Sequence, residues 1–126
     1  MTIAEVSRKM DISADTLRYY ERIGLIPPVK RSKSGIRDYS EKDLGWISFA
    51  KCMRSAGISI EALIEYVALF QQGDDTITTR KQILIDQRDE LEKKIKEMQG
   101  TLAYLNTKLE HYEDMLVPKE RKLAEE

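Results

Sequence analysis

The first part of the chain alternates short apolar stripes with polar breaks, and the stripes have helical spacing. "TIAEVSRKM" has one apolar face, and Thr2 with Glu5 forms a capping box at its start. "DIS" interrupts the pattern before "ADTLRYYERI", for which Ser13 is the expected N-cap and Gly24 the expected end. Two short helices joined by a tight turn predict a helix-turn-helix.

A proline-rich segment, "LIPPVKRSKSGIRDY", follows the second helix. Its prolines exclude a helix, and the "KSG" tip between the arms "PVKR" and "IRDY" predicts a small hairpin. Ser40 and Ser59 are then expected to cap two further helices that end near Gly57 and Gly73. These two helices are the most apolar part of the chain. The fold class is therefore mainly α, a winged helix-turn-helix over residues 1–73.

From Thr78 the apolar residues follow a heptad repeat, which predicts a coiled-coil helix running to Leu116, about 58 Å at 1.5 Å per residue. Its one polar seam position is Arg88. The seam either packs back on its own domain or pairs with the same helix of a second subunit, which the length of the repeat favours. We assign residues 76–117 to dimerisation and 118–126 to a charged, frayed tail. The predicted seam comprises Leu84, Leu91, Ile95, Met98, Leu102, Leu105, Leu109, Tyr112 and Leu116.

Charge separates the two halves of this 126-residue chain. Residues 1–58 carry eleven Lys and Arg against seven Asp and Glu, a balance of +4, whereas residues 59–126 carry ten against fifteen, a balance of −5. A basic front indicates a nucleic-acid contact at that end. The single cysteine excludes an intramolecular disulfide, and the first residues resemble neither a signal peptide nor a membrane span. We expect a cytoplasmic protein without a membrane partner.

The basic residues fall on the second helix and the hairpin. Arginine donates to guanine edges and phosphates, and a tyrosine hydroxyl donates to phosphates. The side chains expected on the exposed face of the helix are Thr16, Arg18, Tyr19 and Arg22, and the hairpin adds Lys30, Arg31, Lys33 and Arg37. The order helix, turn, helix, wing favours double-stranded DNA as the partner over a merely solvated surface.

"TIAEVSRKMDISADTLRYYERIGLIPP", "RDYSEKDL" and "MRSAGISIEAL" together resemble the MerR family of transcription regulators along the whole chain. The resemblance implies a homodimer with an antiparallel coiled coil. It also implies an operator between promoter elements set too far apart, which the activated dimer bends and untwists so that RNA polymerase engages both. Carried over by position, the DNA contacts fall on Thr16, Arg18, Tyr19, Tyr20, Arg22, Arg31, Lys33, Arg37, Tyr39 and Arg54. For Tyr20 and Tyr39 a core position is the competing interpretation.

Features that the sequence lacks reduce the number of effector classes to consider. Metal sensors of this family use several cysteines near the end of the dimerisation helix, and here Cys52 and the distant His111 cannot complete a soft-metal site within one subunit. The drug-sensing members carry a further domain. We therefore expect no metal and no cofactor. A single cysteine within "KCMRSAG" is similar to the thiol- and aldehyde-sensing subgroup often called NmlR or AdhR, in which modification of this cysteine switches the dimer.

Three hypotheses follow for Cys52. It is the sensor of an electrophile-responsive regulator, with Lys51 and Arg54 favouring the thiolate and the hydroxyls of Ser48 and Ser55 one turn away. Alternatively, it is a buried core residue of a constitutive or otherwise triggered DNA-binding regulator. A thiol enzyme is the third hypothesis, but it needs a base beside the sulfur, and His111 lies 59 residues away. We therefore expect a regulator and not an enzyme.

Overall fold

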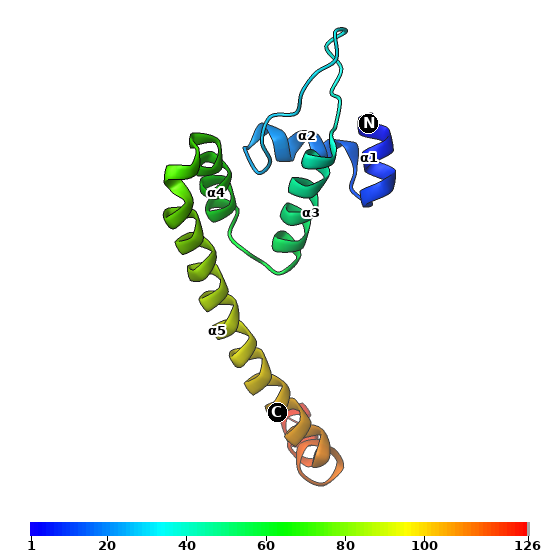
Figure 1. Ribbon diagram of the computed structural model, residues 1–126. Coiled ribbons are helices and arrows are strands. Elements are labelled where there is room, and N and C mark those ends of the chain that lie inside the picture. The colour runs from blue at the N-terminus through cyan, green and yellow to red at the C-terminus, as the bar shows by residue number, and fades with distance from the viewer. Residues whose placement is uncertain (126) are drawn as a thin grey trace. The chain divides into compact units, whose positions relative to one another are not determined.

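The computed structural model describes residues 1–125, and the chain folds into helices with one hairpin between them (Figure 1). It consists of two compact units, Met1–Arg88 and Asp89–Glu126, with the boundary inside the longest helix. The first unit holds α1 (Ile3–Met10), α2 (Ala14–Arg22), α3 (Glu41–Ser55), α4 (Ile60–Gln72) and the 3-10 turn η1 (Asp74–Thr76). Helix α5 (Ile77–Glu110) crosses the boundary, and the π-helical turn η2 (Tyr112–Leu116) and α6 (Val117–Ala124) follow.

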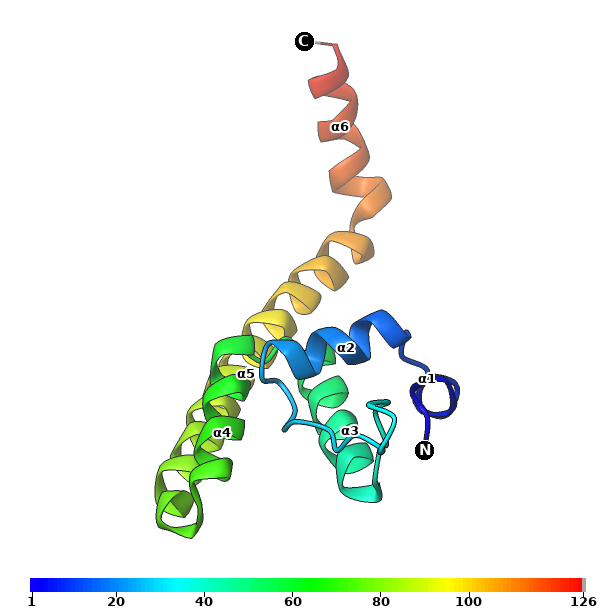
Figure 2. The same ribbon diagram turned by 90° about the horizontal axis from the view of Figure 1, so that it is seen from above.

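The helix starts of the first unit confirm the capping predictions. Thr2 and Glu5 form the capping box of α1, and Ser13 accepts from the backbone N–H of Thr16 at the start of α2. Asp11 ends α1 in the left-handed conformation, with φ 53°. The two helices cross steeply: Figure 2 shows α1 along its axis, whereas α2 lies across the picture. This steep crossing is the predicted helix-turn-helix.

The core of the first unit comes from α1 to α4 and the segment after α2. Val6, Leu17 and Ile47 are completely buried, and Leu25 and Ile26 are nearly so. Lys51 on α3 donates from Nζ to the carbonyl oxygen of Met10 at 2.6 Å, so α3 also satisfies the open end of α1. Gly24 has φ +82° in the turn after α2, a conformation that L side chains rarely adopt. The buried side chains therefore hold α2 and the segment that follows it in the same core.

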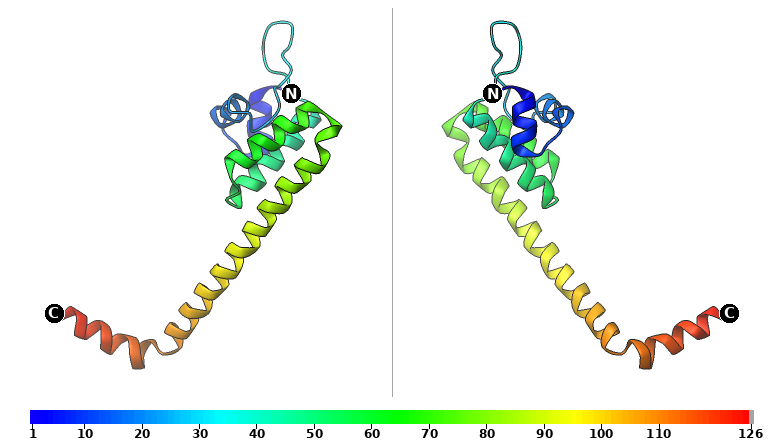
Figure 3. Two further views of the ribbon diagram at one scale, coloured as in Figure 1. Left: turned by 90° about the vertical axis from the view of Figure 1, so that its left-hand side faces the viewer. Right: turned by 90° about the vertical axis from the view of Figure 1, so that its right-hand side faces the viewer.

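The predicted hairpin, hereafter the wing (residues 30–38), projects away from α1–α4 (Figures 1 and 3). Its arms pair at one antiparallel bridge, Arg31 with Arg37, and Asp38 N donates to the Lys30 carbonyl at 2.8 Å. The tip closes with a bond of 2.9 Å from Gly35 N to the Ser32 carbonyl. The wing is therefore a tight loop on a short paired stem, without longer strands in residues 1–125.

The end of the long helix differs from the prediction. The heptad pattern predicts a continuous helix to Leu116, but α5 ends at Glu110, and the segment 118–126, predicted to be frayed, lies largely in α6. Pro118 explains the start of α6, because its ring clashes with the carbonyl four residues earlier in a regular helix but is tolerated in the first turn of a new one. Arg121 and Lys122 then favour the last turn of α6. Glu126 lies outside the described residues.

No helix among residues 1–125 combines the length and apolar character needed to cross a bilayer.

Candidate nucleic-acid interface and cysteine site

Helix α2 presents the predicted cationic face to solvent. Leu17 is fully buried, while Arg18, Tyr19 and Arg22 on the other side are exposed. Arg18 Nη1 lies 2.8 Å from the Asp15 carboxylate, and the Arg22 guanidinium lies 5.5 Å from the centre of the Tyr19 ring. An exposed pair such as Arg18–Asp15 contributes about 0–1 kcal/mol, so a phosphate or a base edge can replace the carboxylate at little cost. The side chains on this face of α2 contact one another and still can bind an anion.

Glu21 joins α2 to the wing, a role that no local pattern in the sequence indicates. Its Oε1 accepts from Arg37 Nε at 2.7 Å and its Oε2 accepts from Val29 N at 3.2 Å. Both charged side chains are largely buried, at 15% exposed for Glu21 and 23% for Arg37. Breaking such a pair leaves a buried charge unpaired, which costs several kcal/mol. Arg37, predicted as a DNA contact, thus holds the wing against α2.

The remaining wing cations are exposed. Lys30, Arg31 and Lys33 all lie at the surface, and Arg31 Nη1 donates to the Gly35 carbonyl at 2.9 Å across the loop. Glu21 links the wing that carries these cations to α2. We refer to the wing cations together with Arg18, Tyr19 and Arg22 of α2 as the basic surface. Their number and their exposure suit contacts to a phosphate backbone.

Three predicted contact residues lie elsewhere or are partly covered. Arg54 is half-buried, and its guanidinium donates to the Ile58 carbonyl just beyond the end of α3. Thr16 and Tyr20 are half-buried on α2, and the Thr16 hydroxyl accepts from the Ser13 hydroxyl at 2.8 Å. The partial burial of Tyr20 is compatible with both the core and the DNA-contact interpretation.

The structure places Tyr39 in the core, which corrects the prediction that it contacts DNA. The residue is 2% exposed, and its buried hydroxyl has no hydrogen-bond partner among residues 1–125. Burial raises the pKa of this hydroxyl, so the ring stays neutral. A side chain covered to this degree does not reach DNA from this conformation. The core interpretation of the "R-x-Y" tyrosine is the one that fits.

Cys52 is exposed on α3, so it is not a core residue of this chain. Three of the four groups expected to assist its thiolate bond to backbone carbonyls instead, and the fourth, Ser48, is exposed. Lys51 donates to the Met10 carbonyl, Arg54 to the Ile58 carbonyl, and the Ser55 hydroxyl to the Lys51 carbonyl at 2.9 Å. The sulfur is therefore accessible to solutes, without a charged group of its own helix bonded to it.

An aromatic cluster joins α3 to α4, and its member Phe49 lies three residues before Cys52. The ring of Trp46 lies 4.8 Å from Phe70 and 6.2 Å from both Phe49 and Tyr66, centre to centre. These contacts hold α4 against α3. No group of three or more His, Cys, Asp or Glu side chains within residues 1–125 is arranged to bind a metal ion.

Two family profiles match the chain. One, described as "MerR HTH family regulatory protein", matches residues 1–69, and the other, "MerR, DNA binding", matches residues 44–108. The transcriptional regulator AdhR of Bacillus subtilis (strain 168) is 63% identical over 91 residues. That alignment covers 72% of this chain and 65% of AdhR, slightly less than two thirds of the relative.

Solved structures are similar over nearly the full length. A protein solved as a MerR family transcriptional regulator of Listeria monocytogenes is 48% identical, with a TM-score of 0.87 over 99% of this chain and 95% of that one. HiNmlR, described as a MerR family regulator lacking the sensor domain and bound to promoter DNA, is 34% identical, with a TM-score of 0.80 over 92% of each chain. AdhR and the Listeria monocytogenes protein are named as transcriptional regulators and HiNmlR as a MerR family regulator, and none of the three is named as an enzyme.

The position of Tyr39 gives a stability prediction. Replacing Tyr39 with Phe removes a buried hydroxyl that lacks a partner and keeps the packed ring. We expect the free energy of unfolding in urea to stay the same or rise by about 1 kcal/mol. Tyr66→Phe, on a half-buried ring of α4, is the control. A loss of more than about 1 kcal/mol for Tyr39→Phe alone would show that the hydroxyl has a stabilising partner.

Proposed function

The chain belongs to the MerR family of helix-turn-helix regulatory proteins, and on that premise we propose that it is a homodimeric transcription regulator of promoter DNA, switched by modification of Cys52. The observation that carries the proposal is the basic surface of α2 and the wing, in which Glu21 holds the two elements together. HiNmlR, of similar fold, was solved on promoter DNA, which supports the same partner here.

In the proposed DNA complex, α2 enters the major groove and the wing follows the backbone. Arg18 and Arg22 supply the cations of α2 that can reach base edges or phosphates, with Tyr19 between them. Lys30, Arg31 and Lys33 supply the phosphate contacts of the wing. Asp15, now paired with Arg18, yields to the DNA on binding. Specificity thus comes from α2, and the wing contributes affinity that falls as salt rises.

The apolar seam of α5 and η2 supports the homodimer. Ile95, Met98, Leu102, Leu105, Leu109 and Tyr112 are between 42% and 72% exposed in the single chain. Full burial of one such side chain contributes roughly 1.5–3 kcal/mol, so a second α5 is a strong binding partner for this face. In the family architecture the two coiled-coil helices are antiparallel and hold two DNA-binding units on a pseudo-palindromic operator.

The proposed action on DNA is mechanical. Bending a site of 20–30 base pairs costs on the order of 1–6 kcal/mol, which the contacts of two basic surfaces can offset. In this family the distortion brings promoter elements into a geometry that RNA polymerase engages. The dimer therefore represses or activates according to the conformation that it holds on the operator.

Cys52 is the proposed sensor because its sulfur is accessible and is the chain's sole thiol. The thiolate attacks the carbonyl carbon of an aldehyde, a C–S bond forms, and the carbonyl oxygen takes a proton from water to give a hemithioacetal. This addition needs no oxidant. The likeness to AdhR supports the assignment to an electrophile-responsive subgroup. Exposure argues against the alternative in which Cys52 is buried in the core of a constitutive regulator.

DNA binding is tested by the affinity for a fragment of the chain's own promoter. Arg18→Ala is expected to weaken binding about tenfold or more, because one bidentate contact to a base is worth about 1–3 kcal/mol. Fluorescence anisotropy at a fixed, moderate salt concentration measures the change. Arg121→Ala removes an exposed arginine from α6 and serves as the matched control. Equal affinities for the two variants would contradict the assignment of α2.

Sensing is tested by transcription in vitro from the same promoter, with and without formaldehyde or methylglyoxal. Wild type is expected to change its output with the aldehyde, and Cys52→Ser is expected to bind DNA equally well and not respond. The variant Cys52→Ser with Ser48→Cys moves the thiol one turn along the exposed face of α3 and controls for general thiol reactivity. A normal response from Cys52→Ser would refute the sensor and leave DNA binding intact.

A further inference from the structure

We propose that an open aromatic groove between α3 and α4 selects the electrophile that Cys52 captures, and that it favours aromatic α,β-unsaturated aldehydes such as cinnamaldehyde. The ring of the aldehyde lies in the groove while its β-carbon meets the sulfur. This inference rests on the proposed sensing role of Cys52 and adds to it a binding site for the body of the electrophile. The groove and the cysteine both belong to the unit Met1–Arg88.

The groove has the size and the lining of a small-molecule site. It measures about 450 Å³, within the range of about 300–1,000 Å³ usual for such sites. Its lining residues are Lys42, Gly45, Trp46, Phe49, Tyr66 and Phe70. The ring centres of Phe49 and Tyr66 lie 5.8 Å apart, and those of Trp46 and Phe70 lie 4.8 Å apart. Ring faces and edges at these separations offer offset and edge-to-face contacts to a further aromatic ring.

Lys42 determines which charge the occupant can carry. Aromatic rings gathered around one groove also suit a quaternary ammonium ion, which binds ring faces through the cation–π interaction. Lys42 lines this groove, is exposed, and forms no ion pair within residues 1–125. Its ammonium group therefore repels a cationic ligand. A neutral or anionic aromatic molecule is the occupant that matches the groove.

Cys52 continues the row of α3 residues that lines the groove. Gly45, Phe49 and Cys52 are spaced four and three residues apart, so they share one face of the helix. Side chains at this spacing are neighbours, with Cβ atoms about 5–6 Å apart. Gly45 and Phe49 line the groove, and Cys52 is exposed. The sulfur thus lies next to the Phe49 end of the groove, beside the place where a stacked ring would carry its reactive carbon.

Capture of such an aldehyde is a conjugate addition. The Cys52 thiolate attacks the β-carbon, a C–S bond forms, and the π electrons of the C=C bond move toward the carbonyl group to give an enolate. The α-carbon of the enolate then takes a proton from water, and the product is a thioether that keeps the aldehyde group. The step needs neither an oxidant nor a reductant. A ring held in the groove raises the effective concentration of the β-carbon at the sulfur.

The selection is tested by the rate of Cys52 alkylation, followed by the mass of the intact reduced protein. The measured quantity is the ratio of the rate constant for cinnamaldehyde to that for acrolein, which has the same enal without the ring. Gly45→Leu places a side chain in the groove, and the variant should fold, because a Cβ at Gly45 meets no atom within 4 Å and leucine favours a helix more than glycine does. We expect it to lower the ratio about tenfold, equivalent to about 1.4 kcal/mol.

Gly100→Leu is the matched control, because Gly100 is an exposed glycine of α5 whose Cβ would also meet no atom within 4 Å. It should keep the wild-type ratio, and equal ratios in the two leucine variants would overturn the proposal. A Gly45→Leu protein that loses the dimer and keeps the ratio would show that a second copy covers the groove, which also overturns it.

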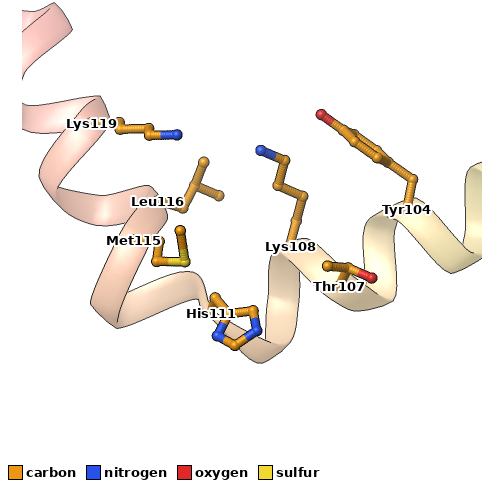
Figure 4. Close-up of a pocket in the computed structure, with 7 residues that line it drawn as sticks. All are labelled: Tyr104, Thr107, Lys108, His111, Met115, Leu116 and Lys119. Atoms are coloured by element: carbon orange, nitrogen blue, oxygen red, sulfur yellow. The ribbon is translucent and has the colours of Figure 1, made fainter.

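A second cavity controls for aromatic binding elsewhere in the chain. It measures about 200 Å³ and lies where α5 gives way to η2, with Tyr104 and His111 among its lining residues (Figure 4). The chain's sole cysteine does not line it. Tyr104→Ala removes a ring from this cavity and should leave the ratio unchanged. A fall in the ratio as large as that of Gly45→Leu would contradict selection by the groove.

The fluorescence of Trp46, the only tryptophan of the chain, tests the groove without the thiol. In a Cys52→Ser background, cinnamyl alcohol, which lacks the carbonyl group and does not alkylate, should change the emission in a saturable way. Adding Gly45→Leu should raise its dissociation constant about tenfold. No saturable change would overturn the groove whether or not Cys52 is a sensor. Saturable binding beside a wild-type thiol that neither aldehyde modifies would instead refute capture by Cys52, and with it the proposed sensor.

Discussion

The apolar stripe along α5 is the constraint on which the rest of this structure depends. From Ile95 to Tyr112 its side chains are exposed in the single chain, although they repeat with the regularity of a core. A helix cannot cover its own stripe, and leaving it in water forgoes the main source of stability available to that half of the chain. In the proposed homodimer a second copy covers the stripe, and the dimer would then have two basic surfaces and two accessible thiols for an operator with two half-sites.

The proposed dimer needs the two elements of each basic surface to be held together, and the Glu21 carboxylate links them. One oxygen holds Arg37 at the base of the wing and the other holds the backbone at Val29, so movement of α2 carries the wing with it. Lys51 likewise ties α3, which carries Cys52, to the end of α1. A change at the sulfur therefore has a short covalent and hydrogen-bonded route to the DNA-binding helices.

Local chemistry makes much of the first unit predictable from sequence. Thr2, Ser13, Ser40 and Ser59 accept the expected backbone hydrogen bonds at the starts of α1 to α4. Features that depend on distant contacts are not predictable in this way. They include the partner that Arg37 finds in Glu21, the choice between the core and contact interpretations of Tyr39, and the exposure of Cys52. The turn after Glu110 could not be predicted, because the heptad pattern of apolar residues continues through it into η2.

The central claim, that a second copy covers the stripe of α5, is tested most directly by the mass of the free protein in solution. Sedimentation equilibrium at micromolar concentration should give 29.2 kDa, twice the chain mass of 14.6 kDa. Leu102→Glu places a charge in the middle of the stripe and should shift the mass toward that of one chain. A wild-type mass of 14.6 kDa, or a Leu102→Glu variant that stays dimeric, would contradict dimerisation through this stripe.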